Sequence, residues 1–166
     1  MSTTQYQDNI KLVSLLAAIS IVFGIIENIF PLPIPFLRLG LSNIGIVIGI
    51  YLLNLRYVLL LGGIKATITA IFSTGFIFRI IIAYPSILFS IIVMYIFYFI
   101  TKRFSTAVSV SVVGSMVNIS TQFIIIKTFI IKNLDFLLIL PYFLIVSIFT
   151  GIIVGYISNI VLKKIT

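Results

Sequence analysis

The chain has 166 residues, of which 61% are hydrophobic and 8% charged, with eleven Lys and Arg against three Asp and Glu. Its mean hydropathy is +1.35. A soluble domain carries about a quarter charged residues because its surface faces water. The composition therefore excludes a soluble globular enzyme and predicts an all-α protein whose outer surface faces membrane lipid.

The chain contains no Cys and no His. Disulfides, thiolate nucleophiles, imidazole acid–base catalysis and the usual transition-metal sites are therefore excluded, and we expect no metal and no cofactor. The Lys and Arg residues are scattered, whereas a nucleic-acid-binding protein favours a continuous basic face, so we expect no nucleic acid partner.

Prolines and polar residues divide the sequence into six apolar stretches. A helix needs about 20 apolar residues to cross a hydrocarbon core of about 30 Å. We predict helices over residues 12–30, 39–53, 57–78, 80–100, 105–126 and 136–162. The first lacks a following small-residue cleavage site, which favours a span over a signal peptide. The second is short, and whether it crosses fully stays open. Residues 1–166 are predicted to form a single transmembrane domain.

The basic residues at the ends of the six stretches indicate the orientation. A cytoplasmic N-terminus places six of them on the inner side: Lys11, Arg56, Lys102, Arg103, Lys163 and Lys164. Four fall on the outer side: Arg38, Arg79, Lys127 and Lys132. In this assignment Arg79 closes the third stretch and Lys127 the fifth. The excess of inner cations predicts that both termini are cytoplasmic.

Small residues at a spacing of four recur in these stretches, and such residues allow helices in lipid to approach closely. The motifs are Ser14-x3-Ala18, Ser20-x3-Gly24, Gly45-x3-Gly49, Gly62 with Ala66 and Ala70, and Gly151-x3-Gly155. Two interpretations stay open: packing within the chain, or docking of a partner subunit on one of the stripes.

Two ionisable residues lie within apolar stretches, where a charge costs about 2.5–3.5 kcal/mol. Lys65 in the third stretch either extends to the inner interface or faces the bundle interior, satisfied by Thr67, Thr69 or a bound anion. Glu27, near the outer end of the first, either pairs with Arg38 or contacts a ligand. These two interpretations of Glu27 are compatible.

Gly114, Asn118 and Gln122 recur every four residues in the fifth stretch and therefore share one helix face. The structural interpretation of the two amides is an interhelical hydrogen bond. The alternative is a ligand site, because most of the scarce polar side chains fall in the outer half of the predicted bundle. The excess of cations there favours an anionic or carboxylate-bearing ligand. The predicted substrate-binding residues are Glu27, Arg38, Asn43, Lys65, Arg79, Asn118, Gln122 and Lys127.

Catalytic motifs are missing from the sequence. The segment Gly62 to Thr67 lacks the spacing of a phosphate-binding loop, so ATP hydrolysis by that route is excluded. Asp8 and Asp135 are the only aspartates and stand alone, whereas a usual prenyl diphosphate synthase needs clustered aspartates to hold Mg²⁺ on a diphosphate. We therefore expect no catalysis by this chain alone.

The segment ENIFPLPIPFLRLGLSN, residues 27–43, resembles the signature of the Gx transporter family, also labelled heptaprenyl diphosphate synthase component I. The resemblance continues at residues 51–53, at Lys65, around residues 73–75 and 90–95, and at Asn118 and Gln122. Val117 stands where the family pattern has a histidine, and Arg38 where lysine is more usual. The resemblance covers nearly the whole chain.

The resemblance implies a fold similar to the substrate-binding S components of energy-coupling-factor transporters, in a bacterial or archaeal cytoplasmic membrane. It implies capture of a small-molecule substrate from the outer face, membrane lipid as surroundings, and a separate ATPase or transmembrane energising module as partner. The synthase label implies instead a non-catalytic membrane component associated with polyprenyl diphosphate synthesis. A purely structural bundle is the third possibility.

Overall fold

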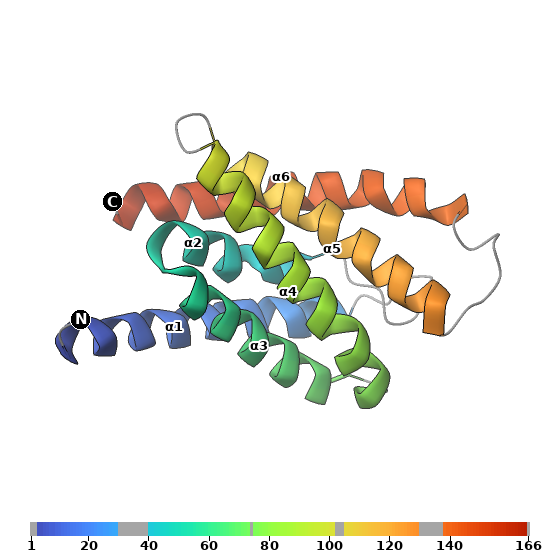
Figure 1. The fold of residues 1–166 in the computed structure, drawn as a ribbon, viewed down its shortest axis with the longest axis horizontal. Helices are drawn as coiled ribbons and strands as arrows, with labels where there is room; N and C mark the ends of the chain where they lie inside the picture. Colours follow the sequence, from blue (N-terminus) through green and yellow to red (C-terminus); the bar gives the residue numbers. More distant parts are fainter. Residues whose placement is uncertain (1–2, 30–39, 74, 102–104, 130–137, 166) are drawn as a thin grey trace.

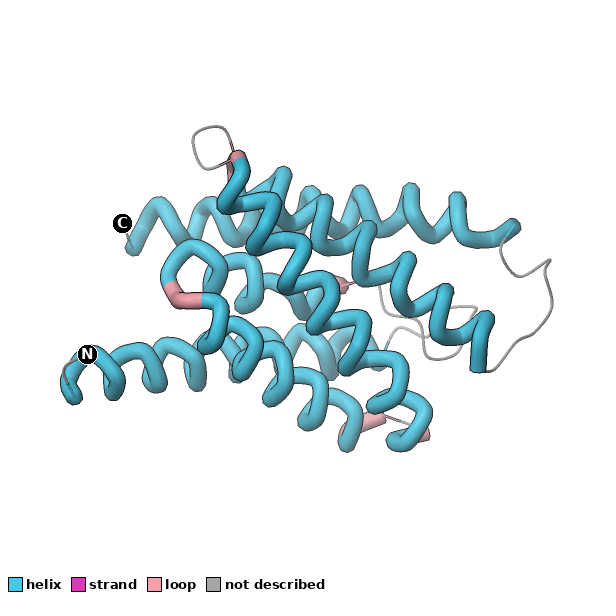
Figure 2. Tube along the Cα trace, viewed as in Figure 1, coloured by secondary structure: helices cyan, strands magenta, loops and turns pink. Residues whose placement is uncertain are grey.

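The computed structural model describes residues 3–29, 40–73, 75–101, 105–129 and 138–165, and these ranges are almost entirely helical (Figures 1 and 2). The α-helices are α1 (Thr3–Ile29), α2 (Ile44–Leu52), α3 (Leu55–Ile71), α4 (Phe76–Ile100), α5 (Ala107–Phe129) and α6 (Leu140–Ile165). A 3₁₀ turn, η1 (Leu41–Asn43), precedes α2. The prediction of an all-α protein with about six helices is confirmed.

Four segments in the described ranges are long and apolar enough to cross a membrane: Gln5–Glu27, Phe76–Ile100, Ala107–Phe129 and Leu140–Ile165. Large apolar side chains also cover the outside, and Ile77 and Ile100 are 70% and 75% exposed. Such a surface is unfavourable in water but suits lipid, where helices satisfy their own backbone hydrogen bonds. The chain is therefore an all-α membrane protein.

Helix α2 has only nine residues, or about 14 Å at 1.5 Å per residue, and so does not cross a bilayer alone. Every residue from Ile44 to Ile50 is buried. The helix is enclosed by its neighbours: Gly45 lies against the Leu16 carbonyl of α1, and Ser158 of α6 donates to the Ile44 carbonyl at 3.5 Å. The N-terminal end of α2, with η1, therefore lies inside the bundle, where polar side chains reach it.

The predicted boundary between the third and fourth stretches, at Arg79, is wrong. Helix α3 ends at Ile71, and Gly75 adopts the left-handed conformation (φ 81°) immediately before α4 begins at Phe76. Residues 76–78 therefore belong to α4, and Arg79 lies near its start. The left-handed Gly75, a conformation that favours glycine, precedes the start of α4, whereas the prediction used the next charged residue as the boundary.

Most of the small-residue motifs pack within the chain. A β-carbon added at Gly24 would lie 2.6 Å from Thr69 Cγ2, and one at Gly62 would lie 2.5 Å from Ile91 Cδ1. One at Gly151 would lie 2.9 Å from the Val112 α-carbon. These glycines bring α1, α3, α4, α5 and α6 close together, which confirms the intramolecular interpretation for them. Ser14 and Ala18 are instead exposed on α1.

Helix α1 begins and helix α6 ends at the same end of the molecule (left in Figure 1). The turn between α3 and α4 lies at the opposite end (Figure 2). Glu27 near the end of α1, Asn43 at the start of α2 and Arg79 near the start of α4 all belong to the half away from the termini. These three of the polar residues predicted to share one depth therefore lie in the same half of the bundle.

Candidate functional site

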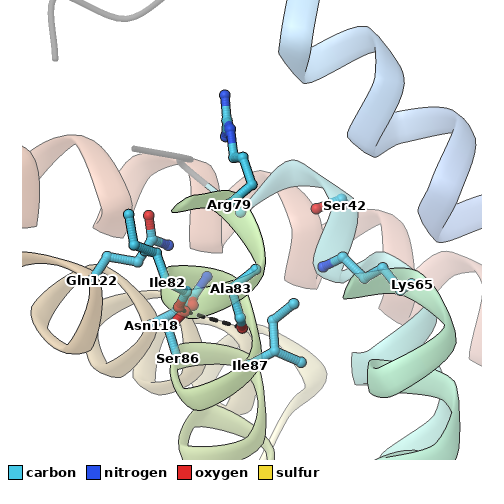
Figure 3. A pocket seen from close by; sticks show the side chains of 10 residues that line it. Ser42, Lys65, Arg79, Ile82, Ala83, Ser86, Ile87, Asn118 and Gln122 are labelled. Carbon is cyan, nitrogen blue, oxygen red and sulfur yellow. Dashed lines mark hydrogen bonds between the residues drawn. The ribbon is translucent and has the colours of Figure 1, made fainter. Parts of the chain in front are cut away.

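A pocket lies between the N-terminal end of η1–α2 and helices α3, α4 and α5 (Figure 3). It is lined by Gly40, Ser42, Lys65, Arg79, Ile82, Ala83, Ser86, Ile87, Asn118 and Gln122. The space open to the centre of a water molecule is about 20 Å³, enough for about one ordered water. The pocket therefore suits a small polar or charged group.

Lys65 of α3 is 2% exposed, and its Nζ donates a hydrogen bond to Asn43 Oδ1 at 2.5 Å. The Lys65 side chain therefore faces the bundle interior, which was one of the two predicted interpretations. Thr69 donates to the Lys65 carbonyl oxygen at 2.8 Å, and Thr67 donates to the Gly63 carbonyl oxygen at 2.9 Å. The Lys65 ammonium group therefore donates a hydrogen bond to a side-chain amide on the neighbouring turn η1.

The carboxylate of Glu27 holds the chain where it enters η1. Its Oε1 accepts hydrogen bonds from the backbone N–H of Gly40 at 2.6 Å and of Leu41 at 3.3 Å. Gly40 has φ 99°, a conformation that favours glycine. Arg38, the predicted ion-pair partner of Glu27, lies outside the described residues. Glu27 thus fixes the backbone beside the pocket without lining it.

Asn118 and Gln122 share one face of α5, as predicted, and both line the pocket. Each is 4% exposed. Gly114, one turn earlier, packs against Met94, and its carbonyl oxygen accepts a hydrogen bond from Ser90 Oγ at 2.7 Å. This face of α5 therefore packs against α4 at Gly114 and lines the pocket at Asn118.

A model of the family described as heptaprenyl diphosphate synthase component I matches residues 16–161. The chain belongs to this family. The matched region contains every residue that lines the pocket of this component I protein. No curated protein and no solved structure matches the chain.

The other predicted site residues of the component I chain take different positions. Arg79 lines the pocket from α4, and in Figure 3 its side chain extends away from Asn118 and Ser86. Lys127 lies in the last turn of α5, is partly exposed, and does not line the pocket. Of the eight predicted residues, the pocket brings together Lys65, Arg79, Asn118 and Gln122, and Asn43 joins them through Lys65.

Sequence reasoning missed two serines that line the pocket. Ser42 of η1 is 1% exposed, and Ser86 of α4 is also 1% exposed. The Ser86 hydroxyl donates to the Ile82 carbonyl at 2.5 Å. Ser86 and Ser90 stand four residues apart in a mostly apolar helix, and this spacing could have indicated a polar face on α4.

Replacing Glu27 with alanine is expected to destabilise this component I protein by about 1–3 kcal/mol, because the backbone donors of Gly40 and Leu41 lose a charged acceptor. Glu27→Gln keeps an acceptor oxygen and should lose less. The chain has no tryptophan, so the thermal midpoint in detergent is best followed by circular dichroism. Equal midpoints for Glu27→Ala and the unchanged protein would contradict this role.

Proposed function

We propose that this component I protein is the substrate-binding subunit of a membrane transporter and that it captures a small anionic or carboxylate-bearing molecule. One observation carries the proposal: Lys65 and Arg79 line the same pocket, while none of its ten lining residues is Asp or Glu. A charge inside a membrane protein is costly and is usually retained for function. Two cations at one pocket favour an anionic ligand.

The helix arrangement supports the same ligand class. Gly40 and Ser42 place the pocket beside the N-terminal end of η1–α2. Helix N-termini carry a partial positive charge and backbone donors that favour anions. In the low-dielectric interior this field adds to that of the two cations. The neutral amides of Asn118 and Gln122 supply hydrogen-bonding groups that orient a ligand.

We propose that the chain binds without catalysing a reaction and that a separate ATPase or transmembrane module energises transport. Asp8 and Asp135 are the chain's only aspartates, and neither belongs to an aspartate-rich motif of the kind that holds Mg²⁺ on a diphosphate. The sequence also lacks a phosphate-binding loop. S components of energy-coupling-factor transporters, which the sequence resembles, divide the work in this way.

The family name supports a second candidate, a non-catalytic membrane component associated with heptaprenyl or polyprenyl diphosphate synthesis. A prenyl diphosphate also carries an anionic head, so pocket charge does not separate the two functions. They differ in their partners: an energising module in one case, and a soluble aspartate-rich synthase subunit in the other.

The test is gentle purification from membranes, followed by native mass spectrometry of the bound molecule and identification of co-purifying proteins. We expect a small anion that is lost from the Arg79→Ala variant, together with an ATPase module. Recovery of a polyprenyl diphosphate with an aspartate-rich subunit would favour the second candidate. A purified protein that holds no small molecule and binds no anionic probe would contradict both.

We further propose that the pocket opens toward the outer side of the cytoplasmic membrane, with both termini cytoplasmic. The chain has no cysteine, so single-cysteine variants are directly usable. In intact cells, a membrane-impermeant maleimide should label Lys127→Cys, at the end of α5, and should leave Lys163→Cys, in the last turn of α6, unlabelled. The reverse pattern would place the pocket on the cytoplasmic side.

A further inference from the structure

Asn118 carries a buried hydrogen-bond acceptor without a protein donor. Its side chain is 4% exposed and lines the pocket, and its Oδ1 has no hydrogen-bond partner in the described part of the chain. Buried polar atoms are nearly always satisfied, so such an atom indicates a partner that arrives from outside the protein. The pocket that Asn118 lines is where that partner would bind.

The surroundings of Asn118 are rich in donors. A β-carbon added at Gly40 would lie 3.8 Å from Asn118 Nδ2, so the amide nitrogen faces Gly40. Lys65 and Arg79, on the same pocket, bear donor groups only. The amide oxygen of Asn43, which does not line the pocket, already accepts a hydrogen bond from Lys65. The pocket therefore combines cationic donors for an anion with one acceptor that needs a donor.

We propose that the pocket selects anions that carry their own O–H or N–H donor beside the negative charge, an inference that rests on the proposed function. Near neutral pH phosphate retains a proton, whereas sulfate, of the same shape, retains none. A 2-hydroxycarboxylate likewise carries a donor that the plain carboxylate lacks. A ligand that leaves a buried acceptor without a hydrogen bond binds more weakly. In the same way, sites built to bind a substrate hydroxyl reject the analogue that lacks this hydroxyl.

The experiment measures the binding of two matched pairs, phosphate against sulfate and lactate against propionate, to the full chain in detergent by titration calorimetry. The donor-bearing member should bind at least about tenfold more tightly to the unchanged protein. In Asn118→Leu this preference should fall to about threefold or less, because the acceptor that distinguishes the two members of each pair is lost.

The outcomes separate this inference from the function on which it rests. Equal affinity within both pairs for the unchanged protein would overturn the selectivity while leaving the anion site in place. An undiminished preference in Asn118→Leu would assign the selectivity to another residue and overturn the role of Asn118. Absence of binding by all four probes would overturn the anion site itself. The comparison within each pair uses the unchanged protein, so it does not depend on whether the variant folds.

Discussion

Replacing Lys65 with methionine is expected to lower the affinity for a small anion by about 100-fold, since a hydrogen bond to a buried charged group contributes about 1.5–3 kcal/mol. Lys65 is 2% exposed and lines the pocket. Methionine has nearly the same length and keeps the interior filled. The change therefore removes the charge and its donors and little else.

The thermal midpoint of the ligand-free Lys65→Met protein should change little. Removing a buried ammonium relieves its desolvation cost, which offsets the loss of the hydrogen bond to Asn43. Lys127→Met is the matched control, because Lys127 is a cation that does not line the pocket. Its affinity should stay within about threefold of the unchanged protein. Similar losses in both variants would indicate a general effect of net charge and would contradict a specific role for Lys65.

Replacing Gly155 with alanine is expected to produce the largest loss of stability of any single-methyl addition between α5 and α6. The added β-carbon would overlap the Val108 α-carbon and lie 2.9 Å from the Ala107 carbonyl oxygen. Both are backbone atoms, so relief requires the two helices to separate. Overpacking of this kind costs about 1–3 kcal/mol, which lowers the thermal midpoint by about 5 °C in a chain of this size.

Gly63→Ala is the control for that variant. Gly63 lies within α3, and a β-carbon there meets nothing within 4 Å. Alanine in a helix is favoured over glycine by up to about 1 kcal/mol, so the midpoint should stay or rise. Circular dichroism melts of both variants in the same detergent give the comparison. A Gly155→Ala protein as stable as Gly63→Ala would show that α5 and α6 pack less closely than the structure shows.

The sequence predicted the helical class and the helix faces better than it predicted where helices end. Periodicity placed Asn118 and Gln122 on one face, because a spacing of four residues fixes a face wherever the helix begins. The start of α4 follows the left-handed Gly75, a local signal that the apolar residues on either side concealed. The first helix also begins nine residues before the predicted start, because polar residues continue α1 to Thr3.

The contacts within the site depend on tertiary distances that a single sequence does not contain. The sequence indicated that a buried Lys65 needs a polar partner. It did not identify that partner as Asn43, which lies 22 residues earlier on η1. Glu27 accepts hydrogen bonds from backbone donors 13 and 14 residues away, contacts that its position in the sequence did not indicate. Ser86 was missed because a serine in a membrane helix usually bonds its own backbone, as this one also does.

The enclosure of α2 has a consequence for how the protein is made. A helix with no lipid-facing side gains nothing from the bilayer, so its final position must await the neighbours that surround it. One of those neighbours is α6, whose Ser158 donates a hydrogen bond to the Ile44 carbonyl at the start of α2, and α6 is synthesised after α1 to α5. Helix α2 therefore reaches its final position, and with it the start that borders the pocket, only after α6 has joined the bundle.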